Sequence, residues 1–415
     1  MERVDTVILG GGIAGLALAE QLAKKGQHVT LLEKYPTWGG RIVTFRSEAT
    51  ATVPALQYEI GAGRIHKDHT RVAALVKRFG LTRYPIGTAS TFHGDPNPFS
   101  NQIHAISAVL DTLDAKAKAT HTIQELLPKE LHPMLEQFPY RAEVDLVRAD
   151  LGIESFKPSG PMGATGTDFY GLKEGLDAIT NGLAAAAAAV GADLRAHHHV
   201  DDAKRRSDGL LEITGSHGKK EEAKPFHLVA KRLVIATCRC SLSDFSVLKG
   251  APLLKQLSTS PLIRIYAVYP KNPSTKKVWF DGMEKVITEG RLRHVIPIRA
   301  DLGLIMISYT DGKDCLYWRE RDGKALQNAI QAEARTEFPD KEIPEPVFLK
   351  KHDWTMGCTY WTPGDYDVEA ALKAAHHPSE NVFVVGESVS REQAWIEGAL
   401  ESVERLLEIP AFKKA

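Results

Sequence analysis

Residues 6–15 read TVILGGGIAG, and this stretch decides the fold. Thr6 to Leu9 is a short apolar, β-branched run, which predicts a strand. A helix is expected from about Ile13 to Lys25, with Gly26 ending it, and a second strand over Val29 to Leu32. The sequence therefore predicts a βαβ unit at the start of the chain.

The glycines between the first strand and the helix match the pattern G-x-G-x-x-G. In this pattern Gly10 permits a tight turn, Gly12 lets the backbone approach a pyrophosphate, and Gly15 allows close packing of helix on strand. The first helical residues, Ile13 and Ala14, then offer free N–H groups and the positive end of the helix dipole to an anion. The turn predicts a dinucleotide site.

Glu33 ends the second strand, 18 residues after Gly15. A carboxylate there accepts hydrogen bonds from both ribose hydroxyls and repels a 2′-phosphate, which argues against NADP. We place Lys34 in the same site. Gly39-Gly40-Arg41 follows closely, and offers close backbone approach and a forked donor for the pyrophosphate.

The bulk composition is that of an ordinary globular protein. The chain has 415 residues, enough for two or three domains, and 43% of them are hydrophobic. Lys+Arg and Asp+Glu each total 52, so the charge gives no support for a nucleic-acid partner. Four cysteines are too few for a disulfide framework and favour a reducing compartment. No signal peptide or membrane-spanning run is visible, so we expect a cytoplasmic protein.

Three apolar strands lie far apart in the sequence: TVIL, then LVIA at 233–236, then VFVV at 382–385. We therefore predict an α/β fold in which a Rossmann-like dinucleotide-binding domain is built from discontinuous segments, with an inserted α+β substrate domain. The boundaries are 1–65, 190–245 and 375–415 for the first domain, and 66–189 and 246–374 for the second. Helices are expected over 103–117, 123–138, 172–190, 325–337 and 395–407.

The stretch from Val7 to Arg41, with E-K-x-x-x-x-G-G-R, resembles the opening of the flavin-containing amine oxidase superfamily. A second similar stretch is Tyr58 to Gly63, and the resemblance implies that Gly61, Ala62 and Gly63 pass beside the flavin ring. A third comprises 384–387 and 393–399. The resemblance implies FAD as the cofactor.

In the third stretch, the resemblance implies that Gly386 and Glu387 bind the ribityl chain. It also implies that the last helix, with Trp395, Ile396 and Ala399, points its N-terminus at the flavin. Val200, after a strand, is similar to a valine that contacts the adenine.

Arg64 follows Gly61-Ala62-Gly63 and resembles the arginine with which the L-amino-acid oxidase branch binds the substrate carboxylate. The alternative is a structural arginine paired with an acid. Trp395, together with Tyr360 or Trp361, is expected to form aromatic walls beside the flavin, the alternative being core packing. We assign Arg64, Trp395, Tyr360 and Arg264 to the catalytic site.

Arg264 stands where the family often has a lysine that holds a water near the flavin. Arginine cannot act as a base at working pH, so either the water relay is rebuilt or Arg264 binds substrate. Cys358 partly matches the cysteine that carries the flavin in monoamine oxidases, but we favour non-covalent FAD. His197, His198 and His199 are consecutive on a strand and cannot all converge on one ion, so we predict no metal.

The resemblance implies hydride transfer from a carbon that bears nitrogen to the flavin, with oxygen as acceptor and hydrogen peroxide as product. Our first hypothesis is an oxidase of an L-amino acid or another carboxylate-bearing amine, and we expect it to form a homodimer. The alternatives are a monoamine or polyamine oxidase, an enzyme similar to carotenoid desaturases or protoporphyrinogen oxidase, and a non-catalytic FAD-binding protein, which Arg264 would favour.

Overall fold

β1 (Glu2–Leu9) lies in the interior of a seven-stranded sheet in the computed structural model, which describes residues 2–87, 90–92, 100–138, 140–156, 168–219 and 222–413. It pairs in parallel with β2 (Val29–Leu32) and with β12 (Lys224–Ile235). Because α1 (Ile13–Lys24) connects β1 to β2, the predicted βαβ unit is confirmed.

The other strands of this sheet come from later in the chain. β9 (Asp193–Arg195) extends the parallel part beside β2, and β18 (Val382–Val384) pairs in parallel with β12. The antiparallel strands β10 (His198–Arg205) and β11 (Leu211–His217) complete it. The three apolar strands that lie far apart in sequence are therefore neighbours in one mixed sheet.

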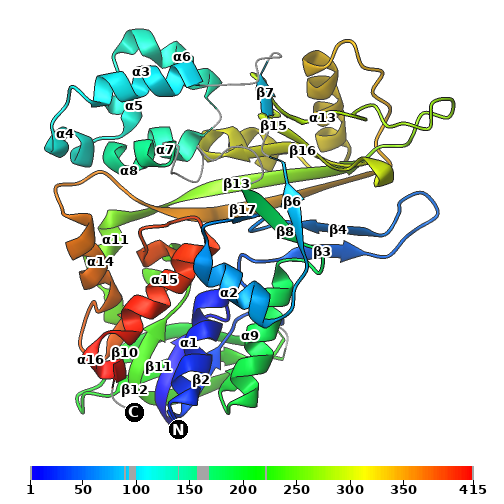
Figure 1. Ribbon diagram of the computed structural model, residues 1–415. Helices are drawn as coiled ribbons and strands as arrows, with labels where there is room; N and C mark the ends of the chain where they lie inside the picture. The colour runs from blue at the N-terminus through cyan, green and yellow to red at the C-terminus, as the bar shows by residue number, and fades with distance from the viewer. Residues whose placement is uncertain are drawn as a thin grey trace.

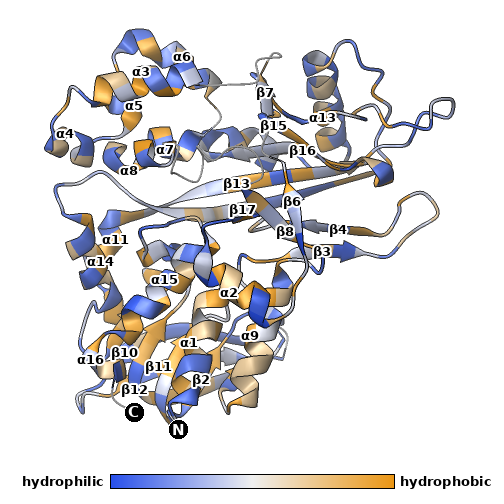
Figure 2. Cartoon of the chain, viewed as in Figure 1, coloured by the Kyte–Doolittle hydropathy of each residue, from blue (hydrophilic) through white to orange (hydrophobic). Residues whose placement is uncertain are grey.

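Helices cover both faces of this first sheet (Figure 1). A hydrophobic core on one face includes residues of α1, α2 (Thr70–Arg78), α9 (Asp177–Ala189), α15 (Ile396–Leu407) and α16 (Pro410–Lys413). The core on the other face includes residues of α10 (Arg239–Leu242), α11 (Leu253–Gln256) and α14 (Val368–His376). Figure 2 shows how hydrophobic the strands between these helices are, as expected for a sheet buried on both faces.

A second sheet of six strands has the order β17-β13-β16-β15-β14-β7, and β13 and β17 run across the middle of the molecule (Figure 1). All its pairs are antiparallel except β14 with β7. Helices α12 (Cys315–Arg319) and α13 (Gly323–Glu337) share a core with it. The strands are β7 (Ser90–Phe92), β13 (Leu257–Val268), β14 (Lys285–Ile287), β15 (His294–Arg299), β16 (Leu304–Asp311) and β17 (Phe348–Trp361).

Smaller units surround the second sheet. One is a helical group with its own core: α3 (Ser100–Leu110), α4 (Ala115–Thr120), α5 (Ile123–Leu126), α6 (His132–Gln137), α7 (Arg141–Asp145) and α8 (Ala149–Glu154). The others are a hairpin of β3 (Thr44–Ser47) and β4 (Leu56–Glu59), and a sheet of β5 (Ile65–His66), β8 (Phe169–Leu172) and β6 (Arg83–Ile86).

Three predicted helices differ from the structure. The helix expected over 103–117 is divided into α3 and α4. The helix expected over 123–138 is divided into α5, a short 3₁₀ turn and α6, because Pro128 cannot continue a helix and Pro133 is tolerated only in the first turn of one, where α6 begins. The helix expected over 172–190 begins only at Asp177, after Gly175 in a left-handed conformation (φ 90°).

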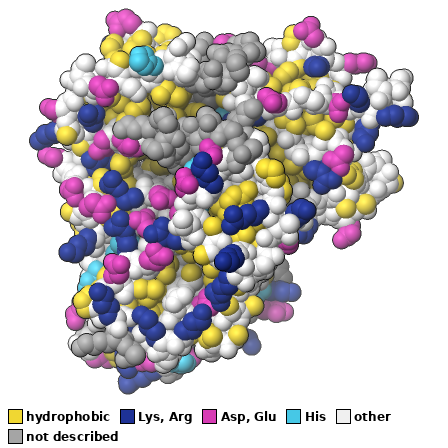
Figure 3. All heavy atoms as spheres, viewed as in Figure 1, with side chains coloured by type: hydrophobic (Ala, Val, Ile, Leu, Met, Phe, Trp, Pro, Cys, Tyr) yellow, Lys and Arg dark blue, Asp and Glu magenta, His cyan; other side chains and the backbone are white. Residues whose placement is uncertain are grey.

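The structure shows how the charged residues are distributed on the surface and which cysteines are paired. On the face shown in Figure 3, Lys and Arg side chains alternate with Asp and Glu side chains, which fits the zero net charge. Cys238 and Cys240 form a disulfide, which the sparse cysteine count did not predict. Cys315 and Cys358 are free thiols. Among the described residues, no helix has the length and apolar character needed to cross a membrane.

Candidate functional site

A cavity of about 1320 Å³ brings together most of the residues that the sequence singled out. Its volume exceeds the roughly 300–1,000 Å³ of common small-molecule pockets, so it has room for a dinucleotide and a small second molecule. Its walls come from the turn after β1, the segment 61–64, the strands β10, β13 and β17, and the segment 386–399. Of the predicted cofactor and catalytic residues, Gly15 alone does not line it.

The glycine turn is built as its sequence predicts. Gly10 has a left-handed φ of 106°, and a Cβ there would lie 2.7 Å from the carbonyl oxygen of Ala236. A Cβ on Gly15 would lie 2.0 Å from the carbonyl oxygen of Gly10. A Cβ on Gly12 would meet no atom within 4 Å, and Gly12 lines the cavity as the N-cap of α1. The helix N-terminus therefore opens into the cavity and can receive an anion.

We expect Gly15→Ala to lower the free energy of unfolding by about 1–3 kcal/mol, because the added methyl group overpacks the helix against the turn. The better helix propensity of alanine offsets at most about 1 kcal/mol of this loss. Urea unfolding of the flavin-free protein measures the change. Gly12→Ala is the matched control and should shift stability by less than about 0.5 kcal/mol. An unfolding midpoint for Gly15→Ala equal to that of the control would contradict this packing role.

The Glu33 carboxylate is buried beside the turn. Its Oε2 accepts a hydrogen bond from the Gly11 N–H at 2.6 Å, and its Oε1 accepts one from the Tyr35 N–H at 2.8 Å. Burial raises the pKa of Glu33, and these backbone donors oppose the rise. Each carboxylate oxygen keeps a further acceptor position for a hydroxyl group. Lys34 and Val200 line the same cavity.

Arg41 and Glu387 connect the N-terminal and C-terminal parts of the cavity wall. The Arg41 Nη1 donates to Glu387 Oε1 at 2.5 Å and to the carbonyl oxygen of Gly357 at 3.1 Å. Glu387 Oε2 accepts from the Ala394 N–H at 3.0 Å. A Cβ on Gly61 would lie 1.9 Å from the carbonyl oxygen of Arg41, so the segment 61–63 also packs directly on this corner.

Arg64 lies in the cavity wall against two aromatic rings, and of these rings only that of Trp395 also lines the cavity. Its guanidinium carbon is 4.1 Å from the ring centre of Phe169 and 5.7 Å from that of Trp395. Burial lowers the pKa of Arg64 from its usual high value, which leaves the group charged at neutral pH. The structure thus brings the predicted residues Arg64 and Trp395 together. It adds Phe169 of β8, which sequence reasoning missed.

Arg264 is anchored on the other side of the segment 61–63. Its Nη1 donates to the carbonyl oxygen of Glu59 at 3.2 Å, and its guanidinium carbon is 5.1 Å from the ring centre of Tyr309. A Cβ on Gly63 would lie 3.0 Å from the same Nη1. Arg264 Nε has no hydrogen-bond partner among the described residues.

The two aromatic candidates on β17 have different surroundings. Tyr360 lines the cavity, whereas Trp361 is 1% exposed, packs in the core of the first sheet and donates its Nε1–H to the carbonyl oxygen of Ser390 at 3.1 Å. Tyr360 is therefore the candidate for an aromatic wall, and Trp361 is a core residue. Cys358 also lines the cavity, and burial raises the pKa of its thiol to about 12.

The three histidines at 197–199 do not gather around one point. His198 stacks on His217 with ring centres 5.2 Å apart, and the His199 Nδ1 lies 2.9 Å from Asp201 Oδ1. Within the part of the chain that the structure describes, no group of three or more His, Cys, Asp or Glu side chains could hold a metal ion.

Several cavity residues carry chemistry that the sequence did not reveal. Glu143, His294, Tyr309 and Asp311 line the cavity, and they come from α7 and from strands of the second sheet. They are single polar residues on separate elements, so no spacing pattern marks them in the sequence.

Comparisons with known proteins agree with this geometry. The family model described as "Flavin containing amine oxidoreductase" matches residues 13–158 and 149–405. (S)-6-hydroxynicotine oxidase of Paenarthrobacter nicotinovorans is 39% identical over 89 residues, which are 21% of this chain and 20% of that protein. L-amino-acid oxidase of Mus musculus is 37% identical over 92 residues, 21% of this chain and 14% of that protein.

Two broader matches cover nearly the whole chain. L-amino acid oxidase of Cerastes cerastes is 21% identical over 95% of this chain and 84% of its own length. The solved structure of cyclohexylamine oxidase from Brevibacterium oxydans IH-35A superposes with a TM-score of 0.73 at 18% identity, covering 97% of both chains, so the folds are alike. Since the family model covers most of its length, the chain belongs to the flavin containing amine oxidoreductases, a family of flavin-dependent oxidoreductases.

Proposed function

We propose that this protein is an FAD-dependent oxidase of an L-amino acid or another amine that carries a carboxylate. The observation that carries this proposal is the position of Arg64. Its guanidinium carbon lies 4.1 Å from the ring centre of Phe169 and 5.7 Å from that of Trp395, and Arg64 lines the same cavity as the glycine turn and Glu387. A planar, permanently charged fork in a cavity wall suits bidentate binding of a carboxylate.

The residues of the cavity fit FAD. The N-terminus of α1 and the bare Gly12 would hold the pyrophosphate, and Glu33 would accept the ribose hydroxyls. Glu387 would bind the ribityl chain, and the N-terminus of α15 would face the ring. Bound FAD would supply the oxidising power, taking hydride from the carbon that bears the amine and passing the electrons to oxygen with release of hydrogen peroxide.

We also propose which residues form the FAD domain and which form the substrate domain. The first sheet and its helices would form a Rossmann-like FAD domain from residues 1–65, 190–245 and 375–415. The second sheet and the helical group would form the substrate domain from residues 66–189 and 246–374. Non-covalent binding is favoured because the Cys358 thiol, with its raised pKa, holds little thiolate at neutral pH.

The protein side chains would orient the substrate and exclude water. Arg64 would fix the carboxylate, and Trp395 and Tyr360 would form the walls beside the reacting carbon. Arg264 is held by the carbonyl oxygen of Glu59 and cannot take up a proton from the amine. We therefore give it a positioning role toward the segment 61–63.

A second candidate is an oxidase of amines without a carboxylate, in which Arg64 is structural. The contact that favours it is the same aromatic packing, because cation–π contacts alone can hold an arginine in place. The first candidate requires the cavity to bind a carboxylate as well as the amine, whereas the second requires only a site for the amine.

A substrate panel decides between them. Under anaerobic conditions, we expect at least one L-amino acid to bleach the flavin at least about tenfold faster than its decarboxylated amine does. The factor corresponds to the charged contact with Arg64 that the amine cannot make. Stopped-flow absorbance of the flavin band measures both rates on the same preparation. Faster bleaching by the decarboxylated amines would favour the second candidate. A flavin that no amine bleaches would contradict both.

A further inference from the structure

Two carboxylates line the cavity at the end formed by the second sheet and the helical group. Glu143 on α7 is 4% exposed, and its Oε2 makes no hydrogen bond of good geometry with the described residues, although the nearby Tyr360 hydroxyl lowers the pKa of this carboxyl. Asp311 ends β16 and lines the cavity beside it. A buried carboxylate oxygen without a partner is costly, so its retention in a cavity wall points to a ligand.

The two carboxylates are held close together by the backbone. The Asp311 oxygens accept hydrogen bonds from the N–H groups of Arg141 and Ala142, both at 3.2 Å, and these residues start the turn that carries Glu143. Burial, and then the charge of Asp311, raise the pKa of Glu143, and burial raises that of Asp311. Ionisation of both acids together is therefore unfavourable, and a positive charge beside them would favour it.

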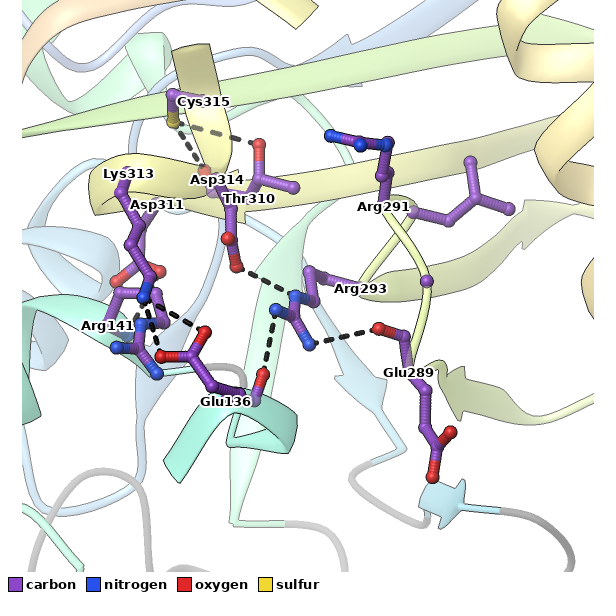
Figure 4. A network of polar contacts seen from close by, with 12 residues as sticks. Glu136, Arg141, Glu289, Arg291, Arg293, Thr310, Asp311, Lys313, Asp314 and Cys315 are labelled. Carbon is purple, nitrogen blue, oxygen red and sulfur yellow. Dashed lines mark hydrogen bonds and ion pairs between the residues drawn. The ribbon is translucent and has the colours of Figure 1, made fainter. Parts of the chain in front are cut away.

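Three cations near Asp311 form ion pairs with other carboxylates, and Figure 4 shows those of Lys313 and Arg293. Each forms its ion pair with a different carboxylate: Arg141 with Asp145 at 2.7 Å, Lys313 with Glu136 at 2.9 Å, and Arg293 with Asp314 at 2.7 Å. Within the described part of the chain, no ion pair reaches Glu143 or Asp311. Glu143 and Asp311 are therefore available to bind a cation from outside this network.

Arg64 and the carboxylate pair face the same tyrosine. Burial raises the pKa of Tyr140, the charge of Arg64 lowers it, and the charges of Glu143 and Asp311 raise it. All of these residues line one cavity. The candidate site for a substrate carboxylate and the acidic pair are therefore both close enough to Tyr140 for their charges to affect it.

We propose that Glu143 and Asp311 form a subsite for a second positive charge on the substrate. An ammonium group at the far end of the substrate side chain would donate charge-assisted hydrogen bonds to the Glu143 carboxylate. An apolar chain end would leave that carboxylate without this partner. Combined with a carboxylate at Arg64, this names a dibasic L-amino acid as the substrate class. The inference rests on the proposed function for the reaction, but the binding preference is measurable without it.

The test compares L-lysine with L-norleucine, which has the same chain without the terminal ammonium. Equilibrium dialysis against the flavin-loaded, anaerobic enzyme should show L-lysine binding at least about tenfold more tightly, the gain from one charge-assisted contact. Glu143→Gln should reduce this preference at least about fivefold. Glu136→Gln removes an acid from the exposed ion pair with Lys313, and as the control it should leave the preference unchanged.

The outcomes separate the subsite from the chemistry. Equal binding of the two amino acids by the unmodified enzyme would overturn the subsite, and bleaching of the flavin by L-norleucine would still support the proposed oxidase. A clear preference for L-lysine without bleaching would support the subsite and contradict the oxidase. The comparison on the unmodified enzyme decides the question even where a variant fails to fold.

Discussion

Gly12→Val is expected to give a folded protein that holds no flavin. A Cβ at Gly12 meets no protein atom within 4 Å, and the residue has φ −73° and ψ 177°, which valine adopts readily. The added side chain therefore costs the protein little. It would occupy the space at the N-terminus of α1 where the backbone must approach the pyrophosphate. We expect the affinity for FAD to fall at least about a hundredfold, which corresponds to roughly 2.7 kcal/mol.

Three measurements together check this result: the ratio of flavin to protein absorbance after purification, a titration of the flavin-free protein with FAD, and circular dichroism. Gly87→Val is the control, because a Cβ at Gly87 also meets no atom within 4 Å and this residue does not line the cavity. It should keep its flavin. A Gly12→Val protein that purifies with a full complement of flavin would show that the cofactor does not lie on this turn.

The N-terminal unit could be predicted from sequence because its determinants are local. A strand, a glycine turn and a helix follow one another over residues 6–25, and the tight approach of Gly15 to Gly10 is made within the unit. The same holds for the strand VFVV and the helix after it, since an apolar run and a 3.6-residue period are readable without a partner. Placement of β1, β12 and β18 as neighbours followed from their shared apolar character.

The substrate end could not be predicted in the same way. Glu143 and Asp311 are 168 positions apart, on a five-residue helix and at the end of a strand, and their proximity comes from two hydrogen bonds to backbone groups of α7. Phe169 reaches Arg64 because β5 and β8 pair, a contact across about 100 residues. Such contacts are set by tertiary structure, so no sequence period records them.

The choice between Tyr360 and Trp361 illustrates the same limit. Adjacent residues of a strand point to opposite faces, so one of them had to face the cavity and the other the core. The sequence does not state which face is which, because both residues are aromatic. The antiparallel register of β17 against β13 decides it, with Tyr360 opposite Ser258 and Trp361 opposite Leu257.

Arg64→Ala should lower kcat/KM for carboxylate-bearing substrates at least about a hundredfold, since hydrogen bonds to a charged group each contribute about 1.5–3 kcal/mol and the arginine fork makes two. The same variant should change kcat/KM for the decarboxylated amines by less than about fivefold, because they make no such contact. Peroxide release under air measures both, and flavin content confirms that the cavity is intact.

The control for this variant is Arg83→Ala. Arg83 also lies over an aromatic ring, 4.5 Å from the ring centre of Tyr170, but it does not line the cavity. If Arg64 serves only to pack against Phe169 and Trp395, its removal would loosen both aromatic rings and lower the rates for acids and amines alike. A selective loss on the acids separates binding from packing, because only a group that contacts the carboxylate can distinguish two substrates that differ in nothing else.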